Sequence, residues 1–266
     1  FFEEVAKLRA ARRIWAKRIR GRYGATDPRS WRLRTHVQTA GCSLTAQQPE
    51  VNIVRTTTEA LAAVLGGCQS LHTNSMDEVL SLPTEKAVRI ALRTQQVLAY
   101  ETGVTNTVDP LAGSYCVEAL TDQMEGQANA YFDKIDEQGG GLACIENGFL
   151  QREIADAAYR YQRQVERGER ITIGVNAFTE GNEESIERLK IDAQVEPSQV
   201  ARLQTLRQQR DGLAVQRALD EVGRAATAGE NLMPALIGAV RVYATEGEIV
   251  ASLKRVYGTY QEKAVI

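Results

Sequence analysis

Two short polar segments, separated by an alanine-rich stretch, constrain the fold more than any other feature of the chain. The first, R-L-R-T-H-V-Q-T-A-G-C, covers residues 32–42, and the second, G-G-C-Q-S-L-H-T-N-S-M-D-E, covers residues 66–78. Each is typical of a strand that ends in side chains able to hydrogen-bond a ligand. A predicted helix over residues 49–65 lies between them. Strand, helix and strand with polar strand ends predict an α/β barrel that builds a site at one mouth.

The polar side chains of these two segments are the candidate site residues. They are His36, Gln38 and Thr39 in the first segment, and Gln69, His72, Asn74, Asp77 and Glu78 in the second. His36 and His72 are the only histidines of the chain. On a barrel strand His36 is either a ligand contact or a satisfied core histidine, whereas we expect His72 to point away from the site in a structural role.

Composition excludes several classes of function. The 266 residues suffice for one large or two smaller domains, and the net charge of −2 with a pI near 5.9 argues against a nucleic-acid partner. No apolar run approaches the roughly 20 residues of a membrane-spanning helix. The four cysteines form no C-x-x-C pair. We therefore expect reduced cysteines, no metal site and a cytoplasmic protein.

The amino-terminal stretch is unusually basic. Residues 1–35 carry eleven Lys or Arg against three acidic residues. This charge indicates either a site for a polyphosphate ligand or a helix face whose acidic neighbours lie elsewhere in the fold. The basic residues are scattered around the helix, which favours the second interpretation. Because Phe1 follows no Met and opens a helix without an N-cap residue, we also expect sequence upstream of it.

Helical and strand-like segments alternate in the first part of the chain. The spacing predicts helices over 2–23, 49–65, 84–102 and 115–138 and strands over 31–38 and 68–71. A short extended segment, V-T-N-T-V-D-P, follows the third helix, and a Gly-Gly-Gly run ends the fourth. In the helix over 49–65 the period places Ile53, Val54, Thr57, Leu61 and Val64 on the buried side. After residue 145 we expect a helix over 150–168, a short strand or extended segment over 171–176 and helices beyond 183. An apolar stripe in these last helices consists of Val200, Leu203, Leu206, Leu213, Leu219 and Val222. The predicted domains are 1–145 for the last β/α units of a barrel, 146–185 for a linker and 186–266 for a helical extension.

Three such β/α units fall short of the eight that close a barrel. The fold class we predict is therefore α/β, the carboxy-terminal part of a TIM-type barrel followed by a mostly helical extension. A partial barrel of this kind would leave strand edges unpaired and an apolar interior exposed.

Four segments closely resemble the catalytic barrel subunit of adenosylcobalamin-dependent acyl-CoA mutases, of which methylmalonyl-CoA mutase is the type member. They are F-F-E-E-V-A-K-L-R-A-A-R (1–12), L-R-T-H-V-Q-T-A-G-C-S-L-T-A-Q-Q-P (33–49), the second polar segment and D-P-L-A-G-S-Y (109–115). The resemblance implies a barrel whose mouth meets the corrin of cobalamin, with the acyl-CoA threaded along the barrel axis. It further implies that an adenosyl radical starts a rearrangement of the substrate's carbon skeleton.

The resemblance also assigns roles to individual residues. It implies that His36, the catalytic candidate, and Gln38 lie near substrate and corrin, and that Asn74 and Glu78 hydrogen-bond the adenosyl ribose. The remaining cofactor-binding candidates are Gly41, Gln69, Ser81 and Leu82. Two of these assignments have simpler alternatives, because Glu78 could cap the following turn and Gly41 could be a turn glycine.

The chain departs from the family pattern at two points. It has no D-x-H-x-x-G motif, whose histidine coordinates cobalt, so we expect a separate or missing cobalamin-binding domain or subunit, along with a missing amino-terminal barrel half. Cys42 stands where fused methylmalonyl-CoA mutases often have Trp. This keeps isobutyryl-CoA and 2-hydroxyisobutyryl-CoA mutases open beside methylmalonyl-CoA mutase. A non-catalytic partial barrel that serves as an assembly module is the rival from another class.

Overall fold

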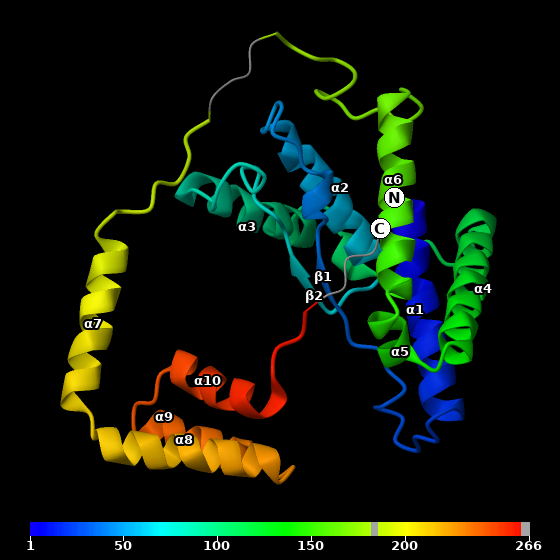
Figure 1. The fold of residues 1–266 in the computed structure, drawn as a ribbon. Coiled ribbons are helices and arrows are strands. Elements are labelled where there is room, and N and C mark those ends of the chain that lie inside the picture. The colour runs from blue at the N-terminus through cyan, green and yellow to red at the C-terminus, as the bar shows by residue number, and fades with distance from the viewer. Residues whose placement is uncertain (182–185, 262–266) are drawn as a thin grey trace. The chain divides into compact units, whose positions relative to one another are not determined.

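A computed structural model describes residues 1–181 and 186–261 (Figure 1). The chain divides into two compact units, the first ending at Leu189 and the second beginning at Lys190. The portions of the predicted linker and helical extension at residues 182–185 and 262–266 lie outside the described residues.

The first unit contains a small sheet and most of the helices. Its strands are β1 (His36–Gln38) and β2 (Ser70–His72), and its 3-10 helices are η1 (Gly41–Ser43) and η2 (Val104–Asn106). Its α-helices are α1 (Phe2–Gly21), α2 (Val51–Leu65), α3 (Glu85–Tyr100), α4 (Tyr115–Glu137), α5 (Gly141–Glu146) and α6 (Phe149–Glu166).

The two strands pair in parallel, and α2 connects them and packs against β2 (Figure 1). The register places His36 opposite Ser70 and Gln38 opposite His72. These four side chains are exposed on one face of the sheet, whereas Val37 and Leu71 are half-buried on the other. The open face is thus polar and not the apolar interior that the sequence led us to expect.

An α/β fold with a parallel strand pair is confirmed, but the strands are shorter and fewer than predicted. The ladder spans three residues per strand. The segment after α3, expected to be extended, instead turns at Gly103, which has a φ of 69°, and forms η2. In the described residues the named sheet therefore has two strands, and a closed barrel is not formed.

Small side chains form the contacts between the first three helices. Alanine supplies much of the buried surface, and it allows helix axes to approach closely. At Gly66, a Cβ atom would lie 2.6 Å from Cδ1 of Leu8 on α1, so a side chain there would displace Leu8. The buried apolar residues are Val5, Ala6 and Ala10 on α1, Ala60, Ala62 and Ala63 on α2, and Ala87, Ala91 and Leu98 on α3.

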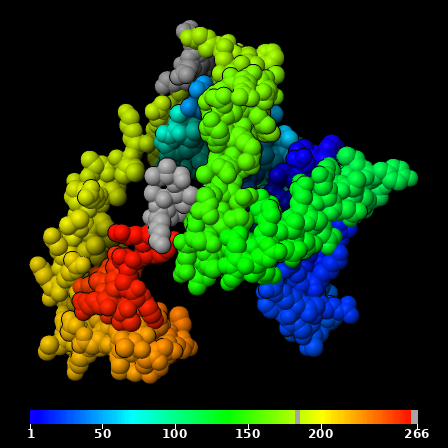
Figure 2. Space-filling view, turned by 45° about the vertical axis from the view of Figure 1, so that its right-hand side comes forward, coloured from blue at the N-terminus to red at the C-terminus, as the bar shows by residue number. Residues whose placement is uncertain are grey.

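The end of the first unit differs in detail from the prediction. Gly139 and Gly140 have positive φ angles and end α4. The chain then forms the short α5, which the sequence analysis did not predict because of the glycine run. The segment over 171–176, expected to be a short strand or extended, contributes an isolated bridge between Ile173 and Ala177. Figure 2 shows α6 on the surface, consistent with the absence of buried residues along its described length.

The second unit is helical. It contains α7 (Val195–Gln209), α8 (Gly212–Thr227), α9 (Met233–Arg241) and α10 (Glu246–Tyr257), and α8 packs against both α9 and α10. The sequence predicted helix from residue 183 onward, but the described residues just before 195 are not helical. Proline is tolerated in the first turn of a helix, and α7 starts at Val195, two residues before Pro197. In the predicted apolar stripe, Val222 is buried as expected, but Leu213 is 77% exposed.

Candidate functional site

The site is assembled where β1 and β2 end. The backbone N–H of Thr39 donates to the carbonyl of His72 at 3.1 Å, extending the strand pair by one bond. The Thr39 hydroxyl then accepts from the backbone N–H of Asn74 at 2.9 Å. The two polar segments therefore leave the sheet side by side, as the carboxyl ends of parallel strands do at a barrel mouth.

Asn74 links the two segments through its side chain. Its amide is 2% exposed, donates to the carbonyl of Thr39 at 3.0 Å, and accepts from Nε2 of Gln38 at 3.0 Å. These bonds fix the orientation of the Gln38 amide on the open face of the sheet. Asn74 therefore orients Gln38, independently of any contact made by the second hydrogen of the Asn74 amide.

Gly41 comes within contact distance of both ribose candidates. A Cβ atom at this position would lie 2.8 Å from Oε1 of Glu78 and 3.1 Å from Nδ2 of Asn74. Gly41 does not have a positive φ angle. The backbone of the turn therefore does not require glycine, whereas an added Cβ atom would have to displace the Glu78 carboxylate.

Asp77, the neighbour of Glu78, supports the start of α3. Oδ2 of the fully buried Asp77 accepts from the backbone N–H of Thr84 at 2.9 Å. Thr84 in turn caps α3 by accepting from the N–H of Ala87. Glu78 is exposed, and within the described part of the chain its carboxylate accepts no hydrogen bond from the backbone. Its carboxylate is thus available to a ligand.

A hollow of about 510 Å³ opens beside this cluster. Its walls come from the end of β1, the segment after β2 and one face of α3. Five residues singled out from the sequence line it together: Gln38, His72, Glu78, Ser81 and Leu82. His72 had been expected to point away, yet it lines the same hollow, because its register partner in the sheet is Gln38.

Two predicted site residues lie apart from this hollow. Gln69 precedes β2, and its side-chain carbonyl accepts from the backbone N–H of Thr35 at 2.6 Å, which joins the starts of the two strands. His36 places Nδ1 2.7 Å from Oγ of Ser70 and lines a separate hollow of about 520 Å³. His36 is thus connected to the site only through Gln38, which lines both hollows.

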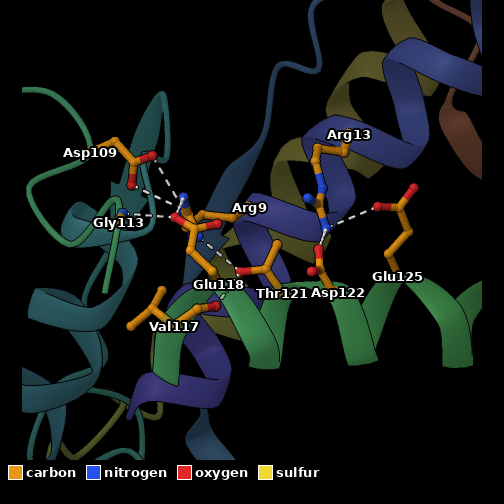
Figure 3. Close-up of polar contacts among 9 residues, drawn as sticks. All are labelled: Arg9, Arg13, Asp109, Gly113, Val117, Glu118, Thr121, Asp122 and Glu125. Carbon is orange, nitrogen blue, oxygen red and sulfur yellow. Dashed lines mark hydrogen bonds and ion pairs between the residues drawn. The ribbon is translucent and has the colours of Figure 1, made fainter. Parts of the chain in front are cut away.

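The basic residues of α1 find acidic partners on α4 and in the loop before it (Figure 3). Arg9 donates to Asp109 at 3.0 Å, to Glu118 at 2.7 Å and to Thr121 at 3.0 Å. The hydrogen bond from Arg9 holds the pKa of the Glu118 carboxyl below its ordinary value, and the N–H of Gly113 adds to this effect.

The pairing continues along both helices. Arg13 contacts Asp122 and Glu125, Lys17 contacts Glu125, and Arg22 contacts Asp136. The interpretation in which the acidic neighbours lie elsewhere in the fold therefore accounts for these cations without a polyphosphate ligand.

Two residues that sequence analysis missed hold the site from α2. Asn52 is fully buried and bonds to the backbone at Thr45 and Met76, and Glu59 accepts from the N–H of Ala40 at 2.7 Å. Apolar periodicity had placed Val54 on the buried side, yet Val54 is 65% exposed. An asparagine flanked by Val51 and Ile53 was the available signal.

Other classes of site were searched in the same part of the chain. Among the described residues, no group of three or more His, Cys, Asp or Glu side chains could hold a metal ion. Nor does any described helix combine the length and apolar character that a membrane crossing requires. The four cysteines are free, and burial raises the pKa of the Cys68 thiol.

Comparison with known proteins settles the family. The sequence matches the family model described as methylmalonyl-CoA mutase over residues 1–259. The chain belongs to the methylmalonyl-CoA mutase family. The resemblance inferred from the four motifs is thereby confirmed.

Curated relatives of this family fall into two named activities. The chain is 47% identical over 267 residues to the 2-hydroxyisobutanoyl-CoA mutase large subunit of Aquincola tertiaricarbonis, covering 100% of this chain and 48% of that protein. It is 47% identical over 260 residues to the methylmalonyl-CoA mutase of Escherichia coli, covering 97% of this chain and 36% of that protein.

A third relative is the probable mitochondrial methylmalonyl-CoA mutase of Caenorhabditis elegans. It is 43% identical over 261 residues, covering 98% of this chain and 35% of that protein. The chain thus spans between about a third and a half of the length of these relatives.

Proposed function

We propose that this chain forms the cofactor-facing end of the catalytic barrel in an adenosylcobalamin-dependent acyl-CoA mutase. The observation that carries the proposal is the convergence of Gly41, Asn74 and Glu78 at the carboxyl ends of two parallel strands. Family membership supports the reaction class, a radical isomerisation of an acyl-CoA carbon skeleton.

The chemistry of the site fits a large nucleoside-bearing cofactor. A side chain at position 41 would fill the space before Glu78, so glycine keeps this surface open to a flat ligand. Leu82, Val88 and Leu92 give the hollow an apolar wall, and the exposed Glu78 carboxylate supplies an acceptor for ribose hydroxyls. Adenosylcobalamin would supply the radical chemistry when bound, while the chain's own residues orient it.

We assign separate tasks to the predicted residues. Glu78 holds the ribose hydroxyls, and Gln38, oriented by Asn74, faces the reacting groups from β1. Ser81 and Leu82 line the corrin side of the hollow. His36 lies two residues before Gln38 on the same exposed face, toward the acyl-CoA. Gln69 joins the strand starts, and we now propose a structural role for it.

The substrate is the least constrained part of the proposal. Conversion of methylmalonyl-CoA to succinyl-CoA is our first choice because most of the curated relatives named above carry that activity. A 2-hydroxyisobutyryl-CoA or isobutyryl-CoA isomerisation is the second. It is favoured by Cys42 in place of the usual Trp and by the equal identity to a 2-hydroxyisobutanoyl-CoA mutase large subunit.

The proposal includes partners. Since the chain has no D-x-H-x-x-G motif, we propose that a separate domain or subunit supplies the lower face of the cobalamin site. The rest of the barrel would come from the remaining length that the relatives possess. Four free cysteines support a cytoplasmic location for the assembly.

The test is an assay of the full-length protein assembled with its cobalamin-binding partner. Methylmalonyl-CoA, 2-hydroxyisobutyryl-CoA and isobutyryl-CoA are supplied in turn with adenosylcobalamin, and the isomers are separated by liquid chromatography and mass spectrometry. We expect turnover of one of these thioesters that depends on added adenosylcobalamin.

The same assay addresses the non-catalytic alternative. An assembly that binds the partner subunit but turns over none of the thioesters would overturn the proposal and favour an assembly module. Turnover of an acyl-CoA without cobalamin would contradict the proposed cofactor.

A further inference from the structure

Both polar atoms of the Asn52 side-chain amide, near the start of α2, are engaged in hydrogen bonds. The residue is 0% exposed. Oδ1 accepts from the N–H of Thr45 at 3.0 Å and from Arg55 at 2.7 Å, while Nδ2 donates to the carbonyls of Thr45 and Met76, both at 2.9 Å. A buried amide with all of these bonds made is costly to replace, because each abandoned partner would stay buried without a hydrogen bond.

The partners of Asn52 belong to the two segments that build the site. Thr45 closes the loop that follows β1 and carries Gly41. Met76 lies between Asn74 and Glu78 in the segment that follows β2. One side chain on the connecting helix therefore ties both segments to the same point.

Glu59 holds only the first of these segments. It lies seven residues after Asn52, two turns along the same side of α2. Its carboxylate accepts from the N–H of Ala40 at 2.7 Å and from the hydroxyl of Ser43. The loop that carries Gly41 is thus fixed at its start by Glu59 and at its end by Asn52.

The two segments approach each other at Gly41, where an added Cβ atom would also lie 3.1 Å from Nδ2 of the buried Asn74. Gly41 stands so close to Glu78 that one added carbon atom would come within 2.8 Å of the carboxylate. A shift of either segment by a few tenths of an ångström would change this separation. The tie through Asn52 is the direct link from α2 to both segments.

We propose that Asn52 is a positioning residue that sets the separation between Gly41 and Glu78, and thereby the shape of the surface that receives the adenosyl group. This proposal rests on the proposed function for its meaning in catalysis. The tie between the two segments can be measured without any cofactor.

The test uses amide hydrogen exchange on the full-length protein without cobalamin. Asn52→Ala removes the tie, and Asn52→Asp keeps its shape while it removes the donors to Thr45 and Met76. We expect both variants to exchange the amides of residues 40–46 and 74–79 at least tenfold faster than wild type. Glu59→Gln should speed exchange in residues 40–46 alone.

Thr121→Val is the matched control. Thr121 is a buried hydroxyl on α4 that donates to the carbonyl of Val117 and accepts from Arg9, far in sequence from either segment. It should lower the melting temperature without a selective effect on the two segments. Wild-type exchange in both Asn52 variants, or an equal acceleration by Thr121→Val, would overturn the proposed tie.

A kinetic measurement then tests the link to the cofactor. In the assembled enzyme, Asn52→Asp should raise the adenosylcobalamin concentration for half-maximal rate about tenfold and change the acyl-CoA KM less than twofold. Faster exchange with unchanged cobalamin saturation would overturn the positioning role. A wild-type assembly that binds no cobalamin would refute the proposed function instead, and the exchange result would still decide the tie.

Discussion

At the scale of single residues, contact distance and not backbone conformation limits the side chain at position 41. We expect Gly41→Ala to fold, because its φ angle suits alanine, and to displace the flexible Glu78 carboxylate from the added methyl group. Adenosylcobalamin saturation should weaken by about tenfold, equivalent to about 1.4 kcal/mol.

Gly126→Ala provides the control for this substitution. Gly126 lies in α4 with no atom within 4 Å of an added Cβ. It should stabilise the helix by roughly 0.5–1 kcal/mol and leave cobalamin saturation unchanged. Equal cobalamin saturation in both variants would argue against Gly41 facing the cofactor.

Glu78 and Asp77 are adjacent carboxylates with different predicted functions. Glu78→Ala should lower kcat roughly tenfold to hundredfold, since a hydrogen bond to a charged group contributes about 1.5–3 kcal/mol, with little change in the acyl-CoA KM. Asp77→Ala should instead lower the melting temperature, because it removes the acceptor for the N–H of Thr84. Measuring kcat, KM and melting temperature on both variants separates the roles. An unchanged kcat in Glu78→Ala would defeat the ribose assignment.

At the scale of elements, α1 and α4 are held together by charge pairs that differ in burial. The Arg9 side chain is only 11% exposed and has three side-chain partners, whereas Arg13 is 39% exposed (Figure 3). Arg9→Ala should cost about 2–3 kcal/mol of unfolding free energy, because a largely buried guanidinium that bonds two carboxylates and the buried Thr121 hydroxyl is lost. Arg13→Ala should cost less than about 1 kcal/mol, as exposed pairs do. Urea denaturation compares the two, and equal losses would contradict the importance of burial.

In the second unit, Glu248 joins the end of α7 to the start of α10. It completes a capping box with Thr245 and accepts from Arg210. The hydrogen bonds from Arg210 lower the pKa of Glu248 from 4.5 to about 2. A lowered pKa in the folded state adds stability that is present above pH 4.5 and is lost as the pH falls toward 2.

Glu248→Gln tests this linkage. We expect the variant to be less stable than wild type at pH 7, and the difference in unfolding free energy to shrink between pH 4.5 and pH 2. Denaturation followed at several pH values measures the difference. A gap between the two proteins that stays constant over this range would show that the charge of Glu248 is not the source of the stability.

At the scale of the whole molecule, the described sheet is too small to stand alone. Two three-residue strands bury little surface, and small isolated sheets are marginal in water. We expect residues 1–266 expressed by themselves to bind cobalamin weakly and to show no mutase turnover. Titration of adenosylcobalamin, followed by absorbance, measures the binding, with the full-length assembly as the control. Tight binding at a stoichiometry of one by residues 1–266 would contradict the need for a partner.

The sequence by itself determined the family, the helices and the order of the two site segments. Helical periodicity located α2, α3 and α4 within about two residues, because amphipathic spacing is a local property. The length of β1 could not be read in the same way, since a strand extends only as far as its partner does. The apolar stripe across α7 and α8 is buried at Val222 but exposed at Leu213, because burial depends on which helix packs against each position.

Only the tertiary structure decided which polar residues work together. Sequence placed Gln69 with the cofactor residues and His72 outside them, whereas strand register put His72 beside Gln38 and left Gln69 at the far end of β2. Asn52 could not be chosen from a helix pattern, because its partners are backbone groups of two distant loops. Periodicity encodes which face of an element is apolar, but hydrogen bonds between loops exist only once the elements have packed.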